Sequence, residues 1–99
     1  MYLTNGKNVK KVSKPYTDIK ITDKYIIREF GDNIDPIELL WHRDNEDRTI
    51  EILGETNWKL QLDNELPTSM NQPIFIPRHK WHRVIKGDGN LRLKIHKNG

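Results

Sequence analysis

Two copies of one tripeptide, Trp41-His42-Arg43 and Trp81-His82-Arg83, carry the residues of this chain that are best suited to chemistry. Each copy lies in an apolar run, and the first leads directly into an acidic cluster, residues 44–47. If both runs are strands, alternation puts each His on the face opposite its Trp and Arg neighbours. Two imidazoles and a nearby carboxylate that face one sheet interior make a set of metal ligands. The repeat therefore predicts a metal site between two strands.

The hydrophobic pattern predicts β-strands along almost the whole chain and no helix of useful length. The predicted strands are residues 17–21, 24–30, 37–43, 49–53, 58–63, 74–76, 81–86 and 91–96. Apolar and polar residues alternate strictly in the fifth and the last of these strands. Gly87-Asp88-Gly89-Asn90 predicts a hairpin between the last two strands, and Gly54-Glu55-Thr56-Asn57 predicts another turn of this kind.

Eight short strands in 99 residues indicate an all-β domain, either a small sandwich or a barrel. An immunoglobulin sandwich is not favoured, because the chain has no cysteine and so lacks the Cys-Trp-Cys frame. We place the domain at residues 16–99 and interpret residues 1–15 as a basic N-terminal arm or an edge strand.

The composition of the chain limits the kinds of binding partner and the cellular location that we expect. Without cysteine the chain has neither disulfides nor thiolate ligands, and with no signal-peptide core or apolar span we expect a cytoplasmic protein with no membrane contact. The formal net charge is only +3, although five lysines fall within the first twenty residues. This lysine-rich segment has no interleaved aromatic platform, no helix-turn-helix pattern and no known nucleic-acid signature, so nucleic-acid binding ranks last among the functions considered.

The residues around the first His resemble a sequence motif of the cupins, a family of small β-barrels. That motif ends with a His, three or four spacers, a Glu, six residues and a Gly. Here His42 is followed by four residues, Asp47, six more residues and Gly54. The family normally has another His two residues before the one matched by His42, and this chain has Leu40 there.

The residues before the second His resemble the other cupin motif, in which Gly, Pro, Gly and His follow one another at fixed spacing. Asn71, Pro77, His79 and His82 occupy these four positions. Asn can replace Gly by adopting a left-handed backbone, whereas His79 is a larger departure. The resemblance covers residues 37–96 and implies a small cupin-like β-barrel, the double-stranded β-helix or jelly roll.

Carried over to this chain, the resemblance implies that His42, Asp47 and His82 bind a divalent metal. Two His and one carboxylate suit Fe(II), with Mn, Ni and Zn as alternatives. Asp44 is the competing carboxylate, because His42-x-Asp44 with a distant His is the arrangement of the oxoglutarate-dependent oxygenases, which share the barrel. Arg92, ten residues past His82, occupies the position where such enzymes often hold the cosubstrate carboxylate. This chain is much shorter than those enzymes, so we rank Asp47 above Asp44.

Two further residues are candidates for proton transfer. Glu51 is a candidate general base, since alternation from Asp47 puts both side chains on one face; the alternative is that Ile50 and Ile52 form the core and Glu51 faces water. His79, on the loop before the second tripeptide, is a candidate acid or base.

The tryptophans indicate a partner. If His42 and His82 face the interior, Trp41 and Trp81 face outward, where Arg43 and Arg83 flank them. An exposed aromatic patch of this kind predicts a sheet-to-sheet homodimer, which is also a common arrangement among cupins.

Two functions follow from the sequence. The first is a cupin-like metalloprotein that acts as a dioxygenase, isomerase or lyase on a small polar substrate. The alternative is a non-catalytic cupin that binds a small ligand, or a dimeric accessory protein, in which the histidines are structural hydrogen-bond partners.

Overall fold

A computed structural model gives the structure of the protein and describes residues 2–5, 8–9 and 15–97. Its strands are β1 (Tyr2–Asn5), β2 (Asn8–Val9), β3 (Thr17–Ile21), β4 (Tyr25–Phe30), β5 (His42–Arg43), β6 (Arg48–Ile52), β7 (Lys59–Leu62), β8 (Thr68–Ser69), β9 (Ile74–Ile76), β10 (His82–Ile85) and β11 (Leu91–Lys97). The helical structure of the described residues is limited to a 3₁₀ turn, η1 (Pro36–Glu38). The predicted all-β class is confirmed.

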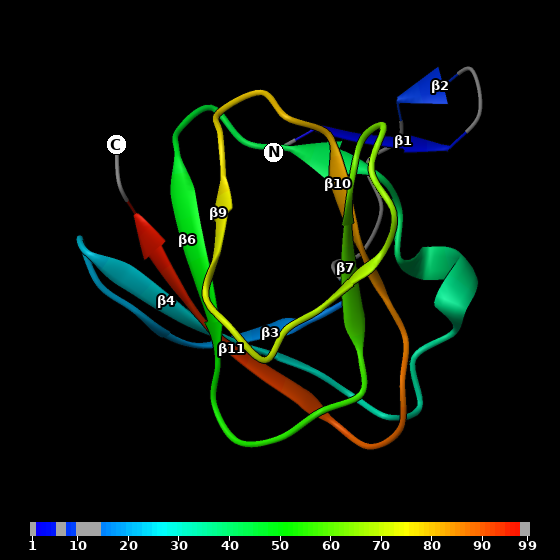
Figure 1. The fold of residues 1–99 in the computed structure, drawn as a ribbon, viewed down its shortest axis with the longest axis vertical. Coiled ribbons are helices and arrows are strands. Elements are labelled where there is room, and N and C mark those ends of the chain that lie inside the picture. Colours follow the sequence, from blue (N-terminus) through cyan, green and yellow to red (C-terminus); the bar gives the residue numbers. More distant parts are fainter. Residues whose placement is uncertain (1, 6–7, 10–14, 98–99) are drawn as a thin grey trace.

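Two antiparallel sheets face each other across the interior (Figure 1). One sheet has six strands in the order β2-β1-β5-β10-β7-β8, and the other has five in the order β3-β4-β11-β6-β9. Neighbouring strands often come from distant parts of the chain, as where β11 lies between β4 and β6. The sheets are not closed into one barrel, and their arrangement is a jelly roll.

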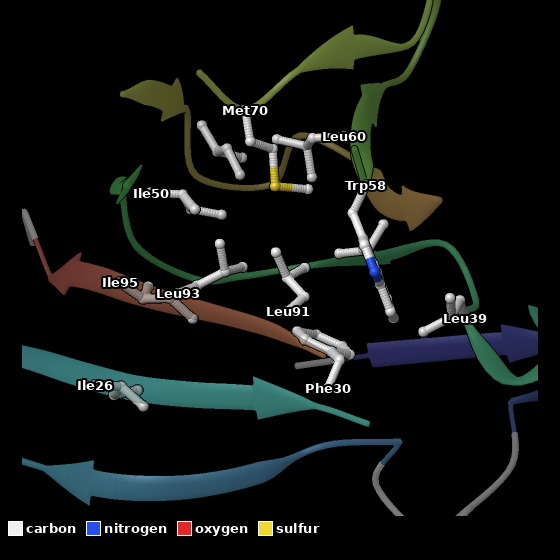
Figure 2. Close-up of a cluster of buried hydrophobic side chains, with 12 residues drawn as sticks. Ile26, Phe30, Leu39, Ile50, Trp58, Leu60, Met70, Leu91, Leu93 and Ile95 are labelled. Atoms are coloured by element: carbon white, nitrogen blue, oxygen red, sulfur yellow. The ribbon is translucent and has the colours of Figure 1, made fainter. Parts of the chain in front are cut away.

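Alternation along the strands builds the core between the sheets. Leu91, Leu93 and Ile95 of β11 point inward and are at most 3% exposed. They pack with apolar residues of β4, β6 and β7 around Trp58, which is fully buried (Figure 2). Each such side chain contributes about 1.5–3 kcal/mol when it leaves water. The core therefore fixes the spacing of the sheets that carry the site.

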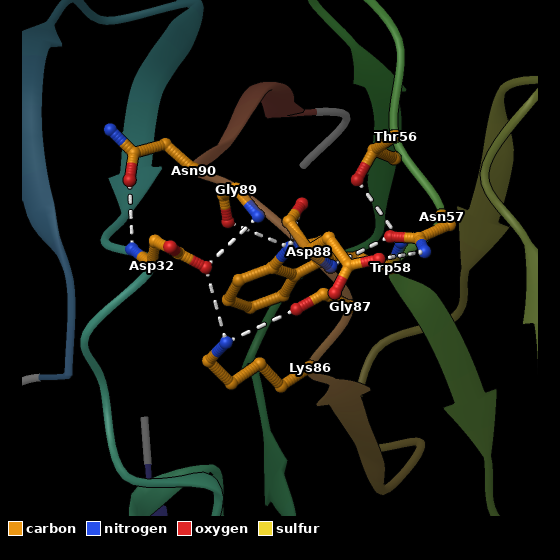
Figure 3. A network of polar contacts seen from close by, with 9 residues as sticks. All are labelled: Asp32, Thr56, Asn57, Trp58, Lys86, Gly87, Asp88, Gly89 and Asn90. Carbon is orange, nitrogen blue, oxygen red and sulfur yellow. Dashed lines mark hydrogen bonds and ion pairs between the residues drawn. The ribbon is translucent and has the colours of Figure 1, made fainter.

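The two predicted hairpins are wrong. Residues 54–57 connect β6 to β7 and residues 87–90 connect β10 to β11, and in each case the two strands belong to different sheets. The two crossings are joined to each other: the Asn57 side chain donates to Asp88 Oδ2 and accepts from the Asp88 N–H (2.9 and 2.7 Å; Figure 3). The Trp58 indole N–H donates to the carbonyls of Asp88 and Gly89. Turn residues here close the end of the jelly roll.

The predicted strand 37–43 is also largely wrong, because only His42–Arg43 pair as β5. Asp35 caps η1 by accepting a hydrogen bond from the Ile37 N–H (3.1 Å), and Pro36 follows at the first helical position. Proline at this position favours a helical start over an extended strand. Ile37 is 76% exposed, so its apolar side chain did not indicate a core position.

The described parts of the N-terminal segment lie at one edge of the six-stranded sheet. Strand β1 pairs with β5, with Leu3 opposite His42, and β2 is the outermost strand. Strand β5 therefore has a neighbour on each side. No helix among the described residues has the length and apolar character needed to cross a membrane.

Candidate metal centre

The two tripeptides pair with each other. Strand β10 runs antiparallel to β5 with His82 directly opposite His42. The two imidazoles meet edge to face, with ring centroids 4.1 Å apart. Both line an interior cavity, as the alternation predicted. His82 is only 2% exposed.

The neighbours of the two histidines make a reciprocal contact. The Arg83 guanidinium lies 4.8 Å from the Trp41 ring centroid, and that of Arg43 lies 5.2 Å from the Trp81 ring. These four residues are half-buried and do not line the cavity. Arg83 Nε also donates to Gln61 Oε1 of β7. The contacts therefore hold β5 against β10 on the side opposite the histidines.

Asp44 supplies the carboxylate at this point. It follows β5, two residues after His42, and is 5% exposed. Its Oδ2 lies 3.5 Å from His82 Nε2. Its buried Oδ1 has no hydrogen-bond partner, and the closest cation, Arg48 Nη1, is 3.7 Å away. One ligand atom from each of His42, Asp44 and His82 can be chosen so that all three lie within 4.8 Å of one another.

Backbone contacts orient both imidazoles. His42 Nδ1 bonds the Leu40 carbonyl (3.2 Å) and His82 Nδ1 bonds the Lys80 carbonyl (2.8 Å). A carbonyl oxygen only accepts, so each Nδ1 donates its N–H. In the neutral ring this leaves a lone pair on Nε2, which is the arrangement that supports a metal-binding His.

Both histidines are held in the neutral form. Burial lowers the pKa of His42 to about 4, with a further contribution from the neighbouring His82, while Asp44 opposes the change. Burial also lowers the pKa of His82, against the opposing effects of the Lys80 carbonyl and Asp44. At neutral pH two lone pairs and one carboxylate therefore converge, and neither imidazole is charged. This donor set fits a divalent metal.

The structure brings Asp44, and not Asp47, to the two histidines. Asp47 Oδ1 accepts a hydrogen bond from the Arg78 N–H (2.8 Å), and Asp47 neither lines the cavity nor belongs to the metal-ligand group. The ranking of Asp47 above Asp44 therefore does not match the geometry. Alternation along the chain indicates the same position, because Asp44 lies two residues after His42 and shares its face.

Three other predicted site residues lie away from the cavity. Glu51 Oε1 is 2.8 Å from His96 Nε2 on the outer face of the five-stranded sheet, while Ile50 on the same strand points inward. Arg92 donates to Glu29 Oε2 (2.6 Å) and also lies on that outer face. His79 is exposed. The alternative stated for Glu51, that it faces outward, agrees with its position.

His79 nevertheless has a structural connection to the site. Its φ of 65° is left-handed, so it keeps the conformation that the cupin motif provides with glycine. Its N–H donates to the Asp44 carbonyl (2.7 Å). Asn71, by contrast, does not have a positive φ. The loop before β10 thus helps to hold Asp44 in place.

Sequence reasoning missed Arg28 of β4, which lines the cavity from the opposite sheet and is 6% exposed. Its Nε and Nη2 donate to the two oxygens of Asp18 (2.7 and 3.3 Å). The Tyr16 ring, 3.6 Å away, covers the guanidinium, and burial raises the pKa of Tyr16. Position 28 lies between Ile26 and Phe30 on the inward face of the strand. A charged residue at such a core position is the feature of the sequence that could have identified Arg28 as a cavity residue.

The cavity has a volume of about 40 Å³. Its wall is mostly apolar. The polar and charged residues that line it are Tyr16, Arg28, Glu38, His42, Asp44, Arg48 and His82. A single water needs about 10–15 Å³ on this measure, so the space suits an ion with a few ligand atoms.

Comparison with known proteins identifies the fold. No family model and no curated protein matches the chain. Solved structures do match, among them the following two. One is an RmlC-like cupin family protein with a double-stranded β-helix fold from Methanocaldococcus jannaschii, 14% identical, with a TM-score of 0.57 over 98% of this chain and 87% of the other. The other is KdgF from a Halomonas species, 12% identical, with a TM-score of 0.59 over 100% of this chain and 95% of the other. The chain has the cupin fold, which confirms the predicted double-stranded β-helix.

Proposed function

We propose that this protein is a metal-binding cupin in which His42, Asp44 and His82 hold one divalent metal. The observation that supports the proposal is the convergence of the buried Asp44 carboxylate with two imidazoles whose Nδ1 atoms are already bonded. Asp44 Oδ2 lies 3.5 Å from His82 Nε2, and Asp44 Oδ1 lacks a hydrogen-bond partner. Fe(II) is the proposed metal, with Mn, Ni and Zn as alternatives, because two nitrogens and one carboxylate oxygen suit all of them.

The activity we propose is that of a metal-dependent enzyme, of the dioxygenase, isomerase or lyase type, on a small polar substrate. The bound metal would supply a Lewis acid or a centre that binds oxygen. The chain's own residues orient the ligands through the Leu40 and Lys80 carbonyls, and the apolar cavity wall excludes water. Protein ligands at three positions leave others open for substrate.

Elemental analysis of protein expressed with supplemented metal and purified without chelator tests the site. We expect about one metal per chain in the wild type and almost none in Asp44→Asn or His82→Ala. Asp47→Asn is the matched control, because its carboxylate bonds a loop N–H outside the cavity. Metal that is retained in Asp44→Asn and lost in Asp47→Asn would reverse our assignment. A wild type that never binds metal would refute the proposal.

The small cavity supports a second candidate, a non-catalytic cupin in which His42 and His82 are structural. About 40 Å³ leaves little room for a substrate without movement of side chains. This candidate predicts a folded, metal-free protein whose melting temperature does not change when chelator is added. The metalloprotein predicts that the melting temperature falls on chelation.

We also propose a homodimer through the outer face of β5 and β10, where Trp41 and Trp81 stack with Arg83 and Arg43. Light scattering at micromolar concentration should give twice the chain mass, and Arg83→Glu should give a monomer. A monomeric wild type would rule out this interface. A cytoplasmic location likewise stays a prediction from the sequence.

A further inference from the structure

Arg28 is the least expected residue of the cavity wall. The inward positions of β4 are otherwise apolar, with Ile26 and Phe30 on either side of it. A buried charge is costly unless it is paired, and hydrophobic residues of similar volume often stabilise a core at least as well as a buried ion pair. Asp18 balances the charge of Arg28, but this pairing does not explain why a charged side chain lines the cavity that the proposed metal ligands also line.

The contacts of Arg28 fix the plane of its guanidinium. Asp18 accepts from Nε and Nη2, which form one edge of the group, and the Tyr16 ring covers its face. A guanidinium carries five N–H donors and has a second edge, Nη1 and Nη2, with the same parallel geometry. Such an edge matches the two oxygens of a carboxylate. Arg28 is therefore oriented in the manner of an anion-binding residue.

The charge balance of the proposed metal site calls for an anion. A divalent metal with Asp44 and two neutral imidazoles has a net charge of +1 in a cavity whose wall is mostly apolar. Three other charged residues line the cavity. Arg28 is paired with Asp18 (2.7 Å), Arg48 is paired with Glu46 (3.3 Å) and lies 3.7 Å from Asp44, and Glu38 is exposed to solvent, which screens its charge. One further negative charge on a ligand would neutralise the centre, and electrostatic interactions are strong where water is excluded.

The space around the cavity limits the rest of the ligand. A wider groove of about 500 Å³ adjoins it, and Pro15, Tyr16 and Glu38 line both. Of the described residues that line the groove, none is Lys or Arg, whereas Glu29 and Asp35 present carboxylates. A second anionic group would be repelled there. An uncharged polar group would find hydrogen-bond acceptors.

We propose that the cavity binds a small monocarboxylate, with its carboxylate on Arg28 beside the metal and an uncharged polar remainder that extends past Tyr16 and Glu38 into the groove. This inference rests on the proposed metal site and names the substrate class that the site selects. It gives Arg28 the role of a specificity-determining residue.

Calorimetric titration of the manganese-loaded protein with sodium lactate, and separately with lactamide, tests the proposal. Lactamide has nearly the same shape and no charge. We expect lactate to bind at least about tenfold more tightly, the factor that a charge-assisted hydrogen bond produces. The double variant Asp18→Asn/Arg28→Gln replaces the ion pair with two amides, and it should lose about tenfold in lactate affinity and keep one manganese per chain.

Two controls separate binding from folding. Arg78→Gln removes an exposed arginine that lines neither the cavity nor the groove, and it should bind lactate as the wild type does. Arg28→Lys keeps the charge and loses the planar fork, and it should weaken lactate binding while the urea unfolding transition stays cooperative. Equal affinities for lactate and lactamide, or a double variant within about twofold of the wild type, would overturn the inference and leave the metal site intact.

The metal-free protein distinguishes failure of the inference from failure of the proposed function. If the wild type takes up no manganese, the proposed function is refuted, and the lactate titration is repeated on the metal-free protein. Lactate binding that is lost in the double variant would then still support a carboxylate site at Arg28. No lactate binding would overturn that site as well.

Discussion

Protonation of His42 should cost the metal-free protein about 3 kcal/mol of folding free energy between neutral pH and pH 4. Burial is the main reason that the pKa of His42 is lowered from 6.5 to about 4. Because this pKa is lower in the folded state, the unfolded chain binds more protons below pH 6.5. Stability is therefore fully present above pH 6.5 and falls as the pH falls toward 4. The difference between the two values, at about 1.4 kcal/mol per pH unit, corresponds to about 3 kcal/mol.

Urea unfolding of chelator-treated protein at pH 7 and pH 4 measures this cost. Other groups titrate over the same range, so the relevant quantity is the difference between the wild type and His42→Gln. The variant should lose about 3 kcal/mol less than the wild type between the two pH values. His79→Gln, which changes an exposed histidine, is the matched control and should follow the wild type. The same pH dependence in His42→Gln and the wild type would refute the reasoning.

Three further results are expected. Gly87→Ala should destabilise the protein by about 3 kcal/mol in urea unfolding, because the added Cβ would meet Asn57 Oδ1 and lie 2.6 Å from the Trp58 backbone nitrogen. The control variant Gly89→Ala, at a residue with φ +70° and open space around it, should cost only about 1 kcal/mol. Equal losses of stability in the two variants would contradict this account. His79→Gly should raise the free energy of unfolding by about 0.5 kcal/mol. Glycine relieves the strain of the left-handed φ at this position, and this gain outweighs the extra conformational entropy that glycine gives the unfolded chain. A decrease in the free energy of unfolding would show that the imidazole itself stabilises the fold. Metal in thousandfold excess over its Kd should stabilise the fold by about 4 kcal/mol and raise the melting temperature, reversibly with chelator; an unchanged melting temperature would argue against the site.

The sequence was sufficient for the fold class and for the direction of the two histidines. Period-two alternation is a local property, and it placed His42 and His82 on the inner faces of β5 and β10 without knowledge of the topology. It was insufficient for the connections. Turn residues such as those at 54–57 and 87–90 indicate that the chain changes direction. The same residue types occur in a hairpin within one sheet and in a connection that crosses to the other sheet, as both do here.

The choice of Asp47 over Asp44 and the omission of Arg28 have different reasons. Asp47 was chosen by its spacing in a family motif, and a spacing along the chain carries no information on contacts with the loop before β10. In that loop the Arg78 N–H donates to Asp47 Oδ1 and the His79 N–H donates to the Asp44 carbonyl. Arg28 was overlooked because a charge at an inward position conflicts with the apolar pattern of its strand. Such a conflict is where functional residues are to be expected.

The repeated tripeptide has a geometric explanation. When two antiparallel strands are centred on one residue pair, the residue before the centre in one strand lies opposite the residue after the centre in the other. With Trp-His-Arg in both strands, the His pair occupies the centre and each Trp meets an Arg, as the contacts of Trp41 with Arg83 and of Trp81 with Arg43 show. One tripeptide therefore builds both faces: two metal-competent imidazoles inside and two cation–π contacts outside that hold the strands in register. The repeat marks a local twofold arrangement of one site and does not indicate two sites.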